Sequence, residues 1–354
     1  MRIKLAILEN DLGYLSRIVS VFSTKYADKF QIYSYTDADI ALSALVTEKI
    51  DVFVANDAFD LDLTSLPKRC CFAYFVDNAD IDSLNGQRTI CKFQKAELIY
   101  KQILGLYSEI AANISGLHLS DDSCRLITFS SPAGGTGTST FAAAYALYLA
   151  ARKKKVLFLS FEDFGATDLF FAGEGLFTMS DVIFSIKSKK ANLAMKLESY
   201  IKQDPRGVYF YSAASHSLDM LELNHEERKL LISELQSSGS YDCIVLDYDF
   251  GLDKAHNEIY RKSNTIVMVT DGTETGNLKT NRAYAAMQTM DQTAEIPITN
   301  RFVLFYNKFS NKISKAVGNS EIRELGGAPV YAHATTEQIL GQLVELDIFQ
   351  KIDM

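Results

Sequence analysis

Short apolar runs alternate with longer amphipathic segments along the first third of the chain. The apolar runs predict strands, and the amphipathic spacing predicts helices between and after them. The predicted strands are residues 3–8, 31–35, 52–55, 71–76 and 89–91, and the predicted helices are residues 12–26, 38–47 and 96–114. Short strands that alternate with helices are typical of a doubly wound, mostly parallel α/β sheet.

A second α/β pattern follows a polar stretch that has no strong period. Residues 116–122 have the composition of a linker, so the sequence predicts a first domain over residues 1–115 and a second over 123–354. Strands are predicted in the second domain at residues 126–129, 156–159, 242–247, 265–270 and 303–307. The lysine-rich segment 186–202 has helical spacing and predicts an amphipathic surface helix.

Composition narrows the possible functions. The chain has 354 residues and a formal net charge of −8, which argues against general binding of nucleic acid or of an acidic membrane. No signal peptide is recognised at the start, and no apolar run is long enough to span a bilayer. Five cysteines without metal-ligand spacing predict reduced thiols in a cytosolic protein.

The clearest motif is a glycine-rich loop between a predicted strand and a predicted helix. Strand, glycine loop and helix form the context of a phosphate-binding loop, or P-loop, in which backbone N–H groups and the helix N-terminus surround an anion. A P-loop normally has lysine before its Ser/Thr, but this chain has Thr138 there; the Ser139 hydroxyl remains as a Mg²⁺ ligand. The residues predicted to hold ATP are Gly134, Gly135, Thr136, Gly137, Thr138, Ser139 and Thr140.

Two carboxylates are predicted to accompany this loop. Residues 242–247 form an apolar strand that ends in Asp247, the form of a Walker B strand, in which the carboxylate holds Mg²⁺ through water. Glu162 follows the predicted strand 156–159, where it would help to position the attacking water or the metal. Glu162 and Asp247 are therefore the candidate catalytic residues.

Two other interpretations of the loop stay open. The loop could be a glycine-rich turn that binds nothing. Alternatively, Gly135 and Gly137 could begin a dinucleotide-binding fingerprint with Glu162 on the ribose, which would indicate an NAD-type redox protein. The third glycine of that fingerprint would fall at Thr140.

The second domain resembles the ParA/MinD family of ATPases with a deviant Walker motif, K-G-G-x-G-K-[ST]-[ST]. In this alignment Ala133 replaces the signature lysine that reaches the partner's nucleotide across a dimer, and Thr138 replaces the ordinary lysine. The resemblance implies that Asn307 binds adenine and that Pro329, in a loop over residues 326–329, packs on the adenine ring. It also implies a homodimer, while residues 343–354 lack the basic amphipathic helix that anchors MinD to membranes.

The first domain resembles a response-regulator receiver domain. Glu9 and Asp11 occupy the acidic positions after the first strand, and Asn56 occupies the position of the phosphoacceptor aspartate. Lys92 lies near the receiver lysine position. We expect these polar side chains to form a solvated rim, and because an amide cannot form an acyl phosphate, we expect the domain to serve docking or dimerisation.

A receiver-like domain followed by a ParA/MinD-like domain resembles the TadZ/CpaE family, and TadZ most. The resemblance implies a cytoplasmic protein, at a cell pole, that helps to assemble the tight-adherence (Flp, type IV) pilus secretion machinery. The missing lysines predict an ATP-binding scaffold with weak or absent ATPase activity. The alternative is an active ATPase that borrows a cation such as Lys279 or Arg282.

Overall fold

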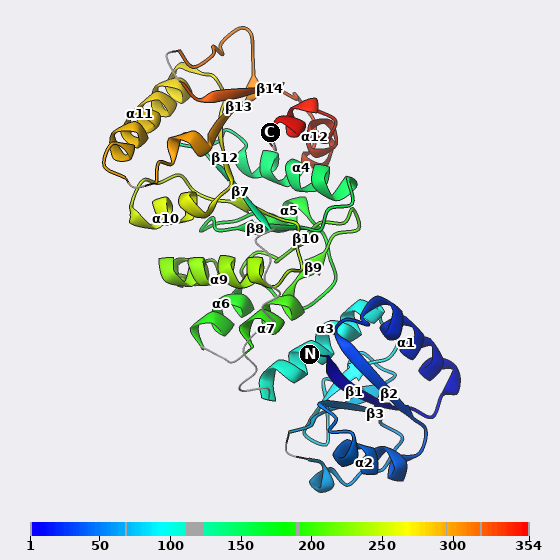
Figure 1. Cartoon of the computed structure of the whole chain (residues 1–354). Coiled ribbons are helices and arrows are strands. Elements are labelled where there is room, and N and C mark those ends of the chain that lie inside the picture. Colours follow the sequence, from blue (N-terminus) through cyan, green and yellow to red (C-terminus); the bar gives the residue numbers. More distant parts are fainter. Residues whose placement is uncertain are drawn as a thin grey trace. The chain divides into compact units, whose positions relative to one another are not determined.

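The structure is a computed structural model that describes residues 2–67, 69–110, 124–188, 192–294, 296–318 and 321–352 (Figure 1). The chain forms two compact units. The first contains residues 1–117 and 188–200, and the second contains residues 118–187 and 201–354. The predicted linker 116–122 lies outside the described residues, so its boundaries stay a prediction.

The first unit is built on a six-stranded sheet with the strand order β2-β1-β3-β4-β6-β5. All neighbouring strands are parallel except the β5–β6 pair. The five strands predicted from the sequence are present. The elements are β1 (Ile3–Leu8), α1 (Leu12–Lys25), β2 (Phe30–Tyr35), α2 (Ala38–Thr47), β3 (Val52–Asn56), the 3₁₀ turn η1 (Leu63–Ser65), β4 (Cys71–Val76), β5 (Ser83–Leu84), β6 (Gln87–Cys91) and α3 (Ala96–Ile110).

Strands and helices alternate less regularly than predicted in this unit. In the described part of the connection from β3 to β4 the helical element is the short η1, and a hairpin of β5 and β6, with no helix between them, follows β4. The hairpin turns at Asn85 and Gly86, which both have positive φ angles, 50° and 74°. Asn-Gly is the usual dipeptide of a tight hairpin turn, so this local signal overrides the alternation.

A short helix from the middle of the sequence belongs to the first unit. Helix α7 (Leu193–Tyr200) packs on α3, with Met195 against the core of that unit. The Tyr100 hydroxyl donates to Glu198 Oε1 over 2.8 Å, and Lys29 Nζ lies 3.9 Å from the same carboxylate. The predicted surface helix over 186–202 is therefore wrong, because α6 (Met179–Lys187) ends early and α7 buries one face, including Lys196.

The second unit is built on an eight-stranded sheet in the order β14-β13-β12-β7-β11-β8-β10-β9. Only the β9–β10 pair is antiparallel. The strands are β7 (Arg125–Ser130), β8 (Val156–Ser160), β9 (Lys202–Gln203), β10 (Tyr209–Phe210), β11 (Cys243–Asp247), β12 (Thr265–Thr270), β13 (Phe302–Phe309) and β14 (Arg323–Pro329). The remaining helices are α4 (Thr138–Ala151), α5 (Thr167–Phe170), α8 (Ser217–Glu222), α9 (His225–Ser237), α10 (Lys254–Lys262), α11 (Glu274–Asp291) and α12 (Thr336–Val344), with 3₁₀ turns η2 (Thr299–Arg301) and η3 (Asp347–Lys351).

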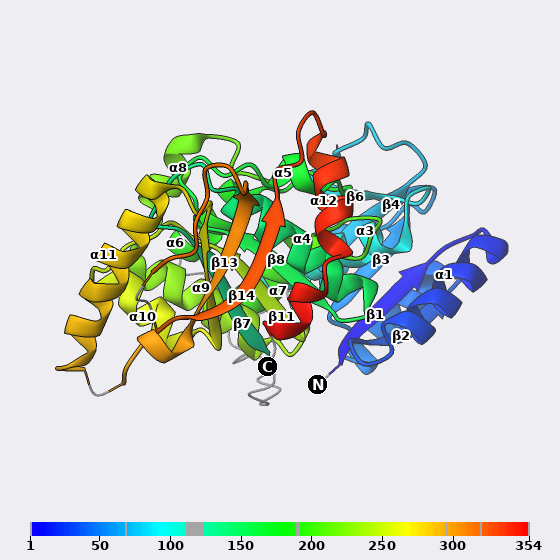
Figure 2. The same cartoon turned by 90° about the horizontal axis from the view of Figure 1, so that it is seen from above.

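Helix α4 is the central helix of this unit. It is apolar around its whole circumference, with every residue from Phe141 to Leu149 buried. It packs against β7, β8 and β11 on one side and against α12 on the other. Figure 2 shows α9, α10 and α11 on the opposite face of the sheet. The predicted fold class, mixed α/β with mostly parallel sheets in both domains, is confirmed.

Strand β14 corrects one element of the prediction. Residues 326–329 were expected in a loop, but they complete β14, which runs parallel to β13 with irregular register. Their Gly-Gly-Ala-Pro composition disfavours a strand. Pairing along β13 overrides this weak local preference.

Candidate functional site

The P-loop lies at the carboxyl end of β7. Residues 131–137 connect β7 to α4, and Gly135 and Gly137 have positive φ angles of 77° and 81°. A Cβ atom on Gly137 would lie 2.5 Å from Asn307 Nδ2, so glycine is required there by both backbone and packing. No side chain caps the N-terminus of α4. The first-turn N–H groups thus remain available to an anion.

Side chains from β13 form hydrogen bonds with the outer side of the loop. Asn307 Nδ2 donates to Thr136 O, and Lys308 Nζ donates to Gly135 O, both over 2.8 Å. On the inner strand side, Ser131 Oγ donates to Val269 O over 2.6 Å. The loop carbonyl groups of Gly135 and Thr136 are therefore engaged by side-chain donors. By contrast, Cβ atoms on Gly134 and Gly135 would have no protein atom within 4 Å, so the protein leaves that face open.

Strand pairing brings the predicted carboxylates beside the loop. In the parallel register Asp247 pairs with Phe129 of β7 and with Ser160 of β8, so three strand ends meet there. Ser139 Oγ donates to Glu162 Oε1 over 3.2 Å. Ser160 Oγ lies 3.5 Å from Asp247 Oδ2. The structure thus places Ser139, Glu162 and Asp247 in one cluster.

The charges of this cluster are not balanced. Asp247 is buried, and burial together with the neighbouring Glu162 raises its pKa well above the ordinary range. The pKa of Glu162 is raised first by burial and then by the charge of Asp249. Among the residues that the structure describes, no Lys or Arg forms an ion pair with Glu162 or Asp247. A hard divalent cation would relieve this repulsion, and one hydroxyl with oxygen ligands is a donor set that suits Mg²⁺.

Arg228 is a neighbour of the cluster that sequence reasoning missed. Its guanidinium lies 3.6 Å from Asp163 Oδ1 and over the rings of Phe161 and Tyr248. It opposes the rise in the pKa of Asp249 that burial and Asp163 cause. Arg228 belongs to α9, far from the P-loop in sequence, and no local motif signals it.

The two cations proposed from sequence are not the ones that the structure brings to the loop. Lys279 and Arg282 lie on α11 and are exposed. Lys308 contacts the loop instead, because it follows Asn307 directly at the end of β13. Its position beside Asn307 could have been noticed in the sequence, since that strand was already predicted to line the site.

The two residues predicted around adenine lie on neighbouring strands. Asn307 is buried and donates its amide to the P-loop, which leaves its Oδ1 atom for a base. Pro329 is exposed at the end of β14, paired with Phe309. Contacts of either residue with a nucleotide stay predictions.

The phosphoacceptor region of the first unit is a closed network. The Asn56 amide donates to both oxygens of the buried Glu9, over 2.8 and 3.0 Å. Lys92 Nζ lies 3.4 Å from Glu9 and 2.8 Å from Asp77. Asp11 instead caps α1. The expected solvated rim is wrong for Glu9, Asn56 and Lys92, which are all buried. They neutralise one another because Asn56 offers donors where aspartate would add charge.

No helix within the described part of the chain has both the length and the apolar character that a bilayer span requires.

Comparison with known proteins gives a family for the first unit and a fold for the second. Residues 1–108 match the family model "TadZ-like, receiver domain". No curated protein matches the sequence. The crystal structure of a ParA family ATPase from Chlorobium tepidum TLS is 18% identical and has a TM-score of 0.51, covering 66% of this chain and 97% of that chain.

Two further solved structures are similar. MinD from Pyrococcus horikoshii OT3, described as complexed with Mg-ADP, is 18% identical with a TM-score of 0.48, covering 65% of this chain and 99% of that chain. MinD from Aquifex aeolicus is 15% identical with a TM-score of 0.47, covering 65% of this chain and 97% of that chain. With a TadZ-like receiver domain followed by a domain that has the ParA fold, the chain has the architecture of the TadZ/CpaE family.

Proposed function

We propose that the second domain binds ATP with Mg²⁺ and hydrolyses it weakly or not at all. The observation that carries this proposal is the pairing of an open, uncapped P-loop with unbalanced carboxylates at Glu162 and Asp247. The N–H groups of the loop suit the phosphates, Ser139 suits Mg²⁺ directly, and Asp247 suits it through water. The metal would balance the charge of the carboxylates and of the phosphates.

Weak hydrolysis follows from what the loop lacks. Stabilisation of charge on the transferring phosphoryl group is usually the largest catalytic contribution. Both lysine positions of the resembling motif are uncharged here, as Ala133 and Thr138. The domain therefore holds the nucleotide but offers little to the transition state.

Two glycine variants test whether the loop is a ligand cradle or only a turn. In Gly134→Ala the new Cβ atom has no protein atom within 4 Å, so the melting temperature should stay unchanged. The same Cβ atom would occupy the open face of the loop, and calorimetry should show ATP binding that is at least tenfold weaker. Gly137→Ala is the matched control and should lower the melting temperature, because its Cβ atom collides with Asn307. Wild-type protein that binds no ATP at millimolar concentration would contradict the proposal. Binding of NAD in preference to ATP would favour the redox interpretation.

The cellular role that we propose is a nucleotide-gated scaffold for the tight-adherence (Flp, type IV) pilus secretion machinery. The TadZ/CpaE architecture supports it. In this proposal the protein is a cytoplasmic homodimer at a cell pole, with pilus and secretion proteins as partners. A strain that carries only Ser139→Ala in place of the wild-type chain should assemble fewer pili. Normal piliation in that strain would show that pilus assembly does not depend on nucleotide binding by this protein.

One observation favours a second candidate, a working ATPase with an unusual cation. Lys308 reaches the P-loop and Arg228 reaches Asp163, so cations lie at both borders of the site. A turnover number of roughly 1 s⁻¹ or more, which falls when Lys308 or Arg228 is replaced, would favour this candidate. Intact ATP that copurifies with the full-length protein would favour the scaffold.

A further inference from the structure

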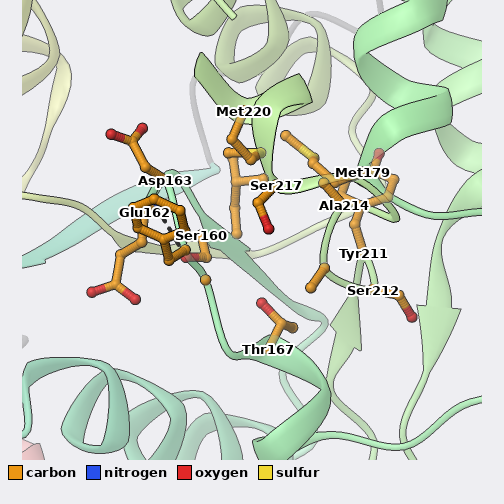
Figure 3. Close-up of a pocket in the computed structure, with 14 residues that line it drawn as sticks. Ser160, Glu162, Asp163, Thr167, Met179, Tyr211, Ser212, Ala214, Ser217 and Met220 are labelled. Atoms are coloured by element: carbon orange, nitrogen blue, oxygen red, sulfur yellow. Dashed lines mark hydrogen bonds between the residues drawn. The ribbon is translucent and has the colours of Figure 1, made fainter. Parts of the chain in front are cut away.

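A pocket of about 140 Å³ lies beside the P-loop cluster, between the loop after β8 and helices α6 and α8 (Figure 3). Its apolar walls include Met179, Tyr211 and Met220, and its hydroxyl groups include Thr167 and Ser217. A cavity of roughly 150 Å³ accommodates a benzene-sized group. The pocket is therefore the size of one large apolar side chain.

Exposed apolar side chains lie on two of the elements that line this pocket. Phe164, which lines it, is 78% exposed, and Leu218 and Leu221 on α8 are 71% and 55% exposed. Leu218 and Leu221 are neighbours of the lining residues Ser217 and Met220 on the same short helix. We name Phe164, Leu218, Leu221 and the pocket the α8 surface. Grouped apolar exposure of this kind marks an interaction site.

The segments that build the α8 surface are acidic. Residues 160–187 and 211–224 contain seven acidic residues, and Lys187 is their single lysine or arginine. The Lys187 ammonium is already engaged by the Glu222 carbonyl and by Glu227. Arg228 offsets one acid, Asp163, at the edge nearest to the P-loop. Asp219 and Glu222 lie on α8 itself. Lys202 Nζ donates to the lining residue Ser212 over 2.7 Å, but Lys202 is buried. The exposed rim therefore remains acidic and favours a basic partner.

A second copy of the chain does not suit this surface when the two-fold axis passes through it. Such a contact would bring identical patches together and would set acidic rim against acidic rim, which opposes association. An acidic membrane or a nucleic acid is excluded by the same sign of charge. A basic, amphipathic helix suits it, because such a helix offers apolar anchors on one face and lysine or arginine beside them.

We propose that the α8 surface docks a basic amphipathic helix of a partner protein, which inserts one large apolar side chain between Met179 and Met220. Methionine side chains adapt their shape to such an anchor. The loop that lines the pocket also contains Glu162, whose carboxylate accepts from Ser139 of the P-loop. Docking is thus linked to the nucleotide site; this linkage, unlike the docking, rests on the proposed function.

The test uses the full-length protein and a synthetic fluorescein-labelled helix of 14 residues. The peptide has leucine at positions i, i+3, i+4 and i+7 and lysine elsewhere. The comparison peptides are a scramble of the same composition and a version with glutamate in place of lysine. Fluorescence anisotropy should show binding of the lysine helix, at least tenfold weaker binding of the scramble, and none of the glutamate peptide. Equal binding of scramble and helix overturns the proposal.

Protein variants locate the binding. Replacing Leu218 and Leu221 together by serine should weaken binding at least tenfold, and thermal unfolding should be unchanged because both side chains are exposed. Leu278→Ser on α11, 51% exposed in the same unit, is the matched control and should bind as wild type does. If both variants lose peptide binding equally, the peptide does not bind at the α8 surface. A change of oligomeric state in the double variant, measured by sedimentation, would assign the surface to a second copy instead.

Addition of ATP with Mg²⁺ tests the linkage separately. An effector typically changes the affinity of a coupled site about five-fold or more. If calorimetry shows ATP binding but the peptide affinity does not move, the linkage is overturned while the docking stands. If no ATP binds, the proposed function fails, and the peptide result remains a test of docking alone.

Discussion

The P-loop cluster and the phosphoacceptor region have both lost the residue that their chemistry needs, yet they respond differently. In the first unit, Asn56 replaces the acceptor aspartate, and Lys92 and the Asn56 amide satisfy the buried Glu9. In the second unit, Thr138 stands at a lysine position, and Glu162 and Asp247 are left with raised pKa values. The first region has its charges paired within the protein, whereas the second has carboxylates that a bound cation would balance.

The two regions show two different roles of a buried charged side chain, one in stabilising the fold and one in binding a ligand. A buried carboxylate that has its own cation and hydrogen-bond donors contributes to a single stable arrangement. Carboxylates that repel each other destabilise the fold unless something binds there. Loss of one motif residue therefore does not decide the role of a site; the charge that remains around it does.

The largest expected effect is at Lys92. Lys92→Met leaves Glu9 buried without its cation, which should lower the free energy of unfolding by about 3–5 kcal/mol. Chemical denaturation measures this, and Lys25→Met, at an exposed ion pair with Glu97, is the matched control and should change it by less than about 1 kcal/mol. Adding Glu9→Gln to the Lys92 variant should recover part of the loss. A Lys92 variant as stable as wild type would show that Lys92 does not balance the charge of Glu9.

The next effect sharpens the comparison at the P-loop. Thr138→Lys returns a cation to the loop and should tighten ATP binding by about 1.5–3 kcal/mol, the range for hydrogen bonds to charged groups. Titration calorimetry measures this change. Thr293→Lys, which adds a lysine at an exposed position after α11, is the matched control and should leave the affinity for ATP unchanged within a few-fold. Weaker binding by the lysine variant would mean that the loop does not face the phosphates.

A smaller effect concerns pH. Because folding raises the pKa of Glu162 and Asp247, their protonated forms favour the folded state, and this stability is lost as pH rises from about 4 through the raised values. Asp247→Asn should therefore raise the melting temperature of the metal-free protein at pH 7.5 by about 2–4 °C. Mg²⁺ should stabilise wild type more than this variant. If Asp247→Asn instead lowers the melting temperature of the metal-free protein, the charge of Asp247 stabilises the fold, as that of Glu9 does.

The smallest expected effect is none at all. Incubation with a small phosphodonor should leave the intact mass unchanged, because Asn56 has no carboxylate and donates to Glu9. A stable adduct on Asp57, which is exposed next to it, would show that the acceptor has moved by one residue.

Much of the fold and part of the site could be predicted from sequence. Local apolar runs define the strands. The strand–loop–helix pattern at residues 126–140 and the apolar strand 242–247 predicted that Ser139 and Asp247 would lie together, as they do in the structure. Arg228, the Lys308 contact and the closed network around Glu9 could not be predicted, since each joins residues far apart in the chain. Strand β14 was missed because its glycines carry no strand preference.

Helix α7 means that neither half of this protein is a continuous stretch of sequence. The chain passes between the two units at three places, near residues 117, 187 and 200. A fragment that starts at residue 123 would keep α7 but lose α3, including Tyr100 that holds Glu198. A single crossover in the gene that exchanged residues 1–117 would therefore separate α7 from the helix on which it packs.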